Sequence, residues 1–171
     1  MSEKVEALFV VLEQISSEEL DRSAQAIAAR EKHDAAQFVA HIAEIAARNY
    51  HLVLGYSTLF EYCIQRFHLS EGSVYRRTQV ARVCRRFPQI LAAISEGRLH
   101  LTGASMIAPH LTEGNVARLI AMAEHATRRE LEKRLVEVAP KKAFVPFRGA
   151  VRAVAGALGQ NDQRVSGVRR S

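Results

Sequence analysis

The chain contains 171 residues, 48% of them hydrophobic, which is enough for one domain with a core of its own and an arm or a tail. Four prolines and nine glycines leave long runs of Ala, Leu, Glu, Arg and Gln, which favour helix over strand. We therefore expect an all-α protein. Glu3 and Glu6 interrupt the first apolar run and no later run is long enough to span a membrane, so we expect a cytoplasmic protein without a signal peptide or a membrane partner.

The net charge of +6 is unevenly distributed along the chain. Residues 1–65 have five basic and ten acidic side chains, whereas residues 66–98 have seven arginines and two glutamates, a balance of +5. Residues 99–140 are balanced, and residues 141–171 have seven basic side chains and one aspartate. Clustered positive charge is typical of a protein that binds a polyanion, although an arginine-rich helix is about as often a solvated surface. Residues 140–171 also contain several glycines, and we expect a weakly ordered tail there.

The first part of the chain favours two long helices. Residues 3–15 place apolar side chains on one helical face, namely Val5, Leu8, Phe9 and Leu12. Ser16 and Glu19 have the spacing of a capping box for a second helix, which meets no glycine or proline before Gly55. Residues 1–54 are acidic and carry no recognisable chemistry, so we predict that they form a scaffold or a dimer-forming arm.

A helix-turn-helix pattern opens the helical domain that we place at residues 55–139. Ser57 is expected to cap a helix that ends at Phe67, and residues 68–70 to form a tight turn before a longer helix capped by Ser70. Another helix is expected to open at Pro88, and Thr102, Thr112 and Thr127 are expected to cap three more, the last with Glu130 in a second capping box.

The longer helix after the turn separates apolar from polar side chains. With Val74 as the origin of a helical wheel, the apolar half includes Val80, Ala81, Val83, Cys84 and Phe87. The opposite half includes Tyr75, Thr78, Gln79, Arg82, Arg85 and Arg86. Arg76 and Arg77 fall toward the apolar half near the helix start, where long side chains can extend past the end of the core.

This segregation predicts a basic face that reads DNA. Ser70 and the amides of the first turn would bind a phosphate at the helix N-terminus. The residues expected to approach base edges are Thr78, Gln79 and Arg82. The residues expected to contact the DNA backbone are Arg76, Arg77, Arg85 and Arg86.

The sequence gives no support for catalysis. Its seven histidines are scattered singly, and none has a second His, Asp or Glu at the spacing of a known metal motif. Cys63 and Cys84 lack a partner at CxxC spacing, and we expect them to be buried free thiols. No Gly-rich phosphate loop or nucleophile elbow is present, so we predict no metal, cofactor or small-molecule substrate.

Three segments carry a resemblance to a known family. GYSTLFEYC, LSEGSVYRRTQVARVCRRFP and GRLHLTGASMIAPHLT occur in that order. They resemble the N-terminal, non-catalytic region of bacterial HNH endonuclease-like proteins, over roughly residues 40–138. A weaker resemblance, through LSEGSVYRR, FPQI and ISEGRL, is to the helix-turn-helix part of ParB-type partition proteins. Both resemblances imply DNA as the partner.

The resemblance also implies what this chain lacks. Members of the HNH family carry a C-terminal module in which histidines and an asparagine surround a divalent metal ion, whereas residues 141–171 contain neither histidine nor cysteine. The chain is then a truncated relative, a stand-alone DNA-binding remnant or a piece of a longer protein.

Three functions therefore remain open. The first is a DNA-binding domain without catalysis. The second is a helical dimerisation or protein-interaction module, in which the acidic N-terminal helices mediate dimerisation and the arginines pair with acids on a partner chain. An arginine face packed against residues 18–34 would favour it. The third, a metal-dependent nuclease, rests on the family resemblance alone.

Overall fold

The computed structural model describes residues 3–138, with side chains from residue 6 onward. These residues form α-helices and one 3-10 turn, with no strand among them, and this confirms the predicted all-α multi-helix fold. The tail predicted over residues 140–171 lies outside the described residues. Along the chain the elements are α1 (Glu3–Glu13), α2 (Ser17–Ala47), α3 (Tyr50–Val53), α4 (Leu59–Phe67), α5 (Glu71–Cys84), α6 (Gln89–Ser95), α7 (Leu101–Ile107), η1 (Ala108–His110), α8 (Val116–Ala123) and α9 (Arg128–Val138).

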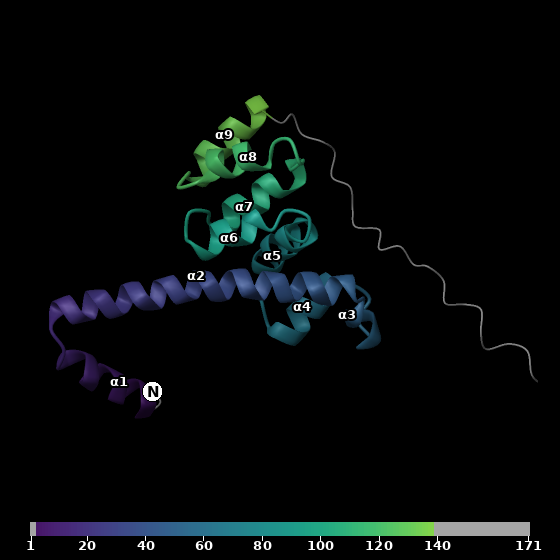
Figure 1. The fold of residues 1–171 in the computed structure, drawn as a ribbon. Helices are drawn as coiled ribbons and strands as arrows, with labels where there is room; N and C mark the ends of the chain where they lie inside the picture. Colours follow the sequence, from purple (N-terminus) through teal and green to yellow (C-terminus); the bar gives the residue numbers. More distant parts are fainter. Residues whose placement is uncertain (1–2, 139–171) are drawn as a thin grey trace, which may run out of the picture.

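The two halves of α2 have different surroundings. Residues 17–34 are all exposed, and most of them project from the rest of the molecule, with α1 at their far end (Figure 1). At the other end of this half, His33 hydrogen-bonds to Ser95 of α6 at 2.9 Å. The second half packs against α5 and α6 and buries Ala36, Val39, Ile42 and Ala43. These four residues belong to the same core as the domain predicted at residues 55–139, so no second core separates the two segments.

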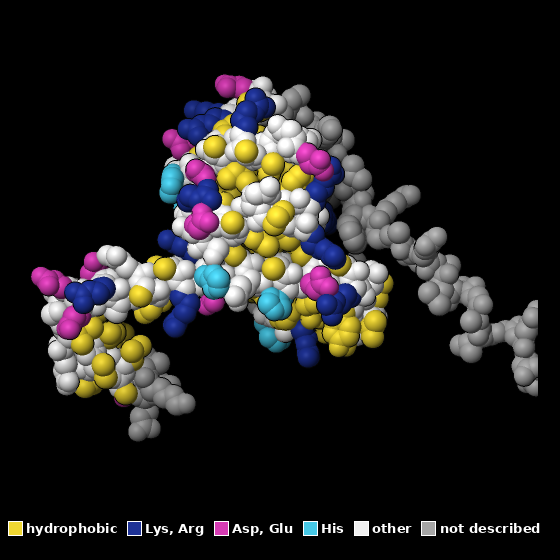
Figure 2. Space-filling view, in the orientation of Figure 1, with side chains coloured by type: hydrophobic (Ala, Val, Ile, Leu, Met, Phe, Trp, Pro, Cys, Tyr) yellow, Lys and Arg dark blue, Asp and Glu magenta, His cyan; other side chains and the backbone are white. Residues whose placement is uncertain are grey.

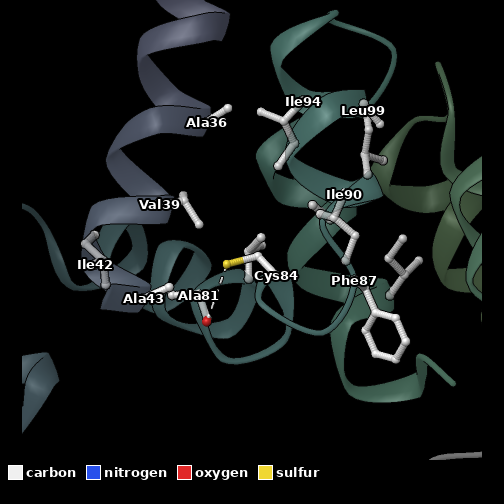
Figure 3. Close-up of a cluster of buried hydrophobic side chains, with 14 of the residues drawn as sticks. Ala36, Val39, Ile42, Ala43, Ala81, Cys84, Phe87, Ile90, Ile94 and Leu99 are labelled. Atoms are coloured by element: carbon white, nitrogen blue, oxygen red, sulfur yellow. Dashed lines mark hydrogen bonds between the residues drawn. The ribbon is translucent and has the colours of Figure 1, made fainter. Parts of the chain in front are cut away.

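The core is built around α5, which is in contact with α2, α4, α6, α7 and η1. Figure 3 shows the side where α2 meets α5 and α6, with Val39 and Ala43 of α2 pointing toward Cys84 and Ala81 of α5. The largest side chains with almost no exposure include Ile42, Ile90, Leu99, Ile107, Leu119 and Leu131. Burial of apolar surface of this kind is the main favourable term in folding.

Two predicted capping boxes are confirmed. The Ser16 hydroxyl accepts a hydrogen bond from the Glu19 amide, and the Glu19 carboxylate accepts one from the Ser16 amide. Thr127 and Glu130 make the same reciprocal pair at the start of α9. Each box satisfies amides that the first helical turn would otherwise leave without partners.

Other helix boundaries differ from the predictions. The second helix ends at Ala47 rather than near Gly55, because Asn49 takes a left-handed conformation at φ 53°. Thr58, not Ser57, caps α4, with its hydroxyl accepting a hydrogen bond from the Glu61 amide at 3.0 Å. The cap of α4 was misplaced because a cap depends on which polar side chain reaches the first free amides of the helix. Neighbouring Ser and Thr residues are equally suited to this role, so the sequence does not distinguish them.

The starts of two later helices were also placed incorrectly. His100 precedes α7 and Asn115 precedes α8, where Thr102 and Thr112 were expected. Asn115 instead accepts a hydrogen bond from the Thr112 amide and donates one to the carbonyl of His110, which orders the loop before α8. Among the helices of residues 3–138, none is both long enough and apolar enough to cross a membrane.

Candidate nucleic-acid interface

The turn between α4 and α5 is three residues long and begins with a left-handed residue. His68, at φ 52°, ends α4, and Ser70 occupies the N-cap position of α5. The Ser70 side chain is exposed and makes no capping hydrogen bond, so its hydroxyl is oriented by solvent rather than by the helix. Left-handed conformations are uncommon for residues other than glycine and typically mark tight turns.

Four of the predicted site residues form an exposed edge, which we call the exposed edge of α5: Tyr75 and Arg82 lie in the helix, Arg85 is its C-cap and Arg86 lies in the turn that follows. The Arg85 and Arg86 side chains are 60% and 67% exposed. Tyr75 and Arg82 are seven residues apart and therefore lie on nearly the same line along the helix. Because α5 is covered on most of its circumference, this edge is narrower than the predicted polar half.

Thr78 and Gln79 were predicted to approach base edges, and the structure contradicts the exposure that this role requires. Thr78 is 4% exposed and Gln79 is 9% exposed. The Thr78 hydroxyl donates to the carbonyl oxygen of Val74 at 2.9 Å, which satisfies its polarity within the helix itself. The exposure predicted from the helical wheel was wrong here, because neighbouring helices cover more than half of the circumference of α5.

Arg77 is part of the fold rather than of an open basic face. Its guanidinium lies 5.7 Å from the centre of the Phe38 ring on α2 and donates to the hydroxyl and the carbonyl oxygen of Ser73. Burial, together with the neighbouring charge of Arg76, lowers the pKa of Arg77. An arginine stacked on an aromatic ring contributes to packing as well as carrying charge. Arg77 therefore has a packing role that we do not assign to the half-buried Arg76.

Arg85 and Arg86 have acidic neighbours within the fold. Arg85 lies 3.6 Å from the Glu44 carboxylate, which also accepts a hydrogen bond from Arg48 at 2.7 Å. Arg86 donates to Glu113 at 2.9 Å. The pKa of Glu44 is lowered, first by the hydrogen bond from Arg48. Such exposed pairs stabilise a protein little, because water and salt screen them and two long side chains must be ordered.

The acidic segment at residues 18–34 does not supply these partners. Glu44 and Glu113 both lie outside it, and most of residues 18–34 project away from the core (Figure 1). Arg85 and Arg86 therefore do not pack against residues 18–34, the contact that would have favoured a purely structural role for the arginine face.

A groove of about 510 Å³ runs beside this edge, and the sequence did not reveal it. Its floor contains Ala43, Ala46 and Ala47 of α2 with Ala81 of α5, and Leu59 and Phe60 form a wall. Arg82 and Arg85 line it as well. Alanines three and four residues apart on α2 are the available signal, because they leave space where larger side chains would fill it.

The titratable residues of the interior do not form a reactive centre. Cys63 and Cys84 are buried and free, as predicted, and burial raises the pKa of the Cys63 thiol to about 11. His51 is also buried, which lowers its pKa. Within residues 3–138, no three His, Cys, Asp or Glu side chains are grouped so that they could hold a metal ion.

Comparison of the chain with protein-family models, with curated proteins and with solved structures finds no match. The resemblances to HNH endonuclease-like and ParB-type proteins therefore stay predictions from the sequence.

Proposed function

We propose that the chain is a DNA-binding domain without catalysis, in which the exposed edge of α5 contacts the duplex. One observation carries the proposal: Arg82 in the last turn of α5, Arg85 at its C-cap and Arg86 in the turn that follows are all exposed, and a three-residue turn joins this helix to α4. Two helices joined by such a turn have the arrangement with which many proteins place a helix against DNA.

The ion pairs of Arg85 and Arg86 do not oppose this function. An exposed carboxylate is a weak competitor for a guanidinium when a row of phosphates is present. Each phosphate that an arginine neutralises also releases condensed counterions, which adds a favourable entropy. DNA would therefore take these arginines from Glu44 and Glu113 at little cost.

The buried positions change the division of roles along α5. Ser70, Tyr75 and Arg76 at its first turns contact phosphate and sugar, and Arg82 is the residue placed to reach a base edge. Arg85 and Arg86 contact the DNA backbone. Thr78, Gln79 and Arg77 support the helix instead of touching DNA. The seven basic residues of residues 141–171 add sequence-independent attraction for phosphate.

A titration of duplex DNA at several salt concentrations tests the proposal. Replacing Arg82 and Arg86 with alanine is expected to weaken binding and to reduce the slope of log K against log salt by about 2. The matched control replaces two exposed arginines on other helices, Arg118 of α8 and Arg129 of α9. Equal losses in both double variants, or no binding at low salt, would contradict the proposal.

A second candidate function, homodimerisation through the N-terminal helices, is favoured by the exposure of α1. Leu8, Phe9, Val10 and Val11 are between 54% and 59% exposed, and Figure 2 shows the hydrophobic surface that they contribute. An isolated helix of 11 residues is marginal in water, and one that is apolar on several sides is normally buried. Sedimentation of the chain without DNA tests this function independently of the first.

A further inference from the structure

The groove beside α5 combines an apolar floor with a cationic edge. Alanines of α2 and α5 leave its floor open, while Phe60, which is 37% exposed, presents an aromatic ring to it. Arg82 and Arg85, one helical turn apart, place positive charge along one side. An occupant that fits places an apolar side chain on the floor and acidic side chains on the side of the two arginines.

The helix α1 has this pattern. Phe9 is exposed, and Glu6 and Glu13 stand one turn before it and one turn after it on the neighbouring side of the helix. Leu12, on another side of α1, and Ile15, in the loop after it, are half-buried. Leu8, Val10 and Val11 are exposed as well, and the stripe of Glu6, Phe9 and Glu13 is the part of this uncovered surface where two acidic side chains flank an apolar one on the same side.

The α1 of the same chain cannot occupy the groove. Ser17, the first residue of α2, lies 26 residues before Ala43, a distance of roughly 39 Å along one continuous helix. Folded back along α2, the 11 residues of α1 would extend only about 16 Å from that end. The occupant must therefore come from another molecule.

We propose that α1 of a second copy of this chain docks in the groove, with Phe9 on the alanine floor and with Glu6 and Glu13 beside Arg82 and Arg85. Two α2 helices placed antiparallel would bring each α1 to the partner's groove, so the contact is reciprocal and closes as a symmetric dimer. This inference rests on the proposed homodimer and specifies which two surfaces form the dimer contact. It also places Arg82 and Arg85 where DNA and α1 compete for them.

A charge-swap experiment with the full-length chain tests this location. One variant carries Glu6→Lys and Glu13→Lys, and the other carries Arg82→Glu and Arg85→Glu. In either variant alone, both reciprocal contacts oppose like charges, and dimerisation measured by analytical ultracentrifugation is expected to weaken by about tenfold or more. In a one-to-one mixture, the lysine helix meets the glutamate groove and the unaltered helix meets the unaltered groove. The mixed dimer is therefore expected to regain the original affinity.

A second measurement locates the contact without changing a charge. A photoreactive benzoylphenylalanine in place of Phe9 is expected to cross-link to a second chain at residues 43–47, 58–60 or 78–85. Phe9→Ala should weaken the dimer. At a protein concentration where the chain is monomeric, it should leave the circular-dichroism melting curve of the helical core unchanged, since Phe9 packs on no core residue.

The outcomes separate the inference from the functions on which it depends. A wild-type chain that stays monomeric would overturn both the homodimer and its location. A dimer that persists in both charge variants, or a mixture without rescue, would overturn the location alone. The salt titration measures DNA affinity separately, and its result bears neither on the homodimer nor on the location of the contact.

Discussion

The two halves of α2 have the same secondary structure but are stabilised in different ways. The second half inserts Ala36, Val39 and Ile42 into the core, whereas every residue of the first half from Ser17 to residue 34 is exposed. Both halves have the composition of a good helix former, but only the second buries side chains. The first contacts the core only at its end, where His33 hydrogen-bonds to Ser95 and Lys32 lies beside Gly97. The comparison shows that helical periodicity alone does not tell whether an apolar stripe faces a core within the chain or a partner outside it.

The largest expected effect comes from replacing one isoleucine with alanine in each half of α2. Ile42 is fully buried and Ile27 is 53% exposed. Ile42→Ala is expected to lower the free energy of unfolding by about 2 to 5 kcal/mol, because it leaves a cavity. Ile27→Ala should change it by less than about 0.5 kcal/mol in the monomer.

Urea unfolding followed by circular dichroism at low protein concentration measures both changes. Similar losses in the two variants would contradict the separation of α2 into a packed half and a projecting half.

A smaller effect is expected at the two capping boxes. Thr127 caps α9, which buries Leu131 and Leu135, so Thr127→Ala should destabilise the core by about 1 kcal/mol. Ser16 caps the projecting half of α2, where local fraying need not unfold the core. Ser16→Ala should therefore lower helicity without moving the main urea midpoint. A midpoint shift as large as that of Thr127→Ala would show that the arm unfolds together with the core.

A third, smaller effect concerns pH. Burial lowers the pKa of His51 below its ordinary 6.5, so the unfolded chain binds a proton more readily than the folded one as the pH falls below that value. The stability contributed by neutral His51 is present above pH 6.5 and is lost progressively as the pH falls toward the lowered value. The urea midpoint should fall over this range in the wild type and fall less in His51→Leu. His68→Leu, at an exposed position, provides the control.

The sequence predicted those parts of the fold that depend on local interactions. The all-α class and the boxes at Ser16 and Thr127 depend on composition and on residues three positions apart, which a sequence displays directly. The break at Asn49 was missed because a left-handed asparagine has no sequence signal as strong as glycine.

The candidate site was harder to predict than the fold. Arg82, Arg85 and Arg86 were correctly expected to be exposed, but Thr78 and Gln79 were not recognised as buried. Their burial depends on how many helices surround α5, and this number is a property of the tertiary structure. The groove was missed for the same reason, since it needs the alanines of α2 to lie opposite Phe60 of α4.

The measurement that tests the central claim most directly is chemical footprinting of arginines with and without duplex DNA. Modification by phenylglyoxal, located by mass spectrometry, reports the accessibility of each guanidinium. We predict that DNA protects Arg82, Arg85 and Arg86 and leaves Arg118 and Arg129 reactive. Protection of the two control arginines instead, or unchanged reactivity along α5 at salt concentrations where DNA is bound, would contradict the assignment of this edge as the DNA-binding surface.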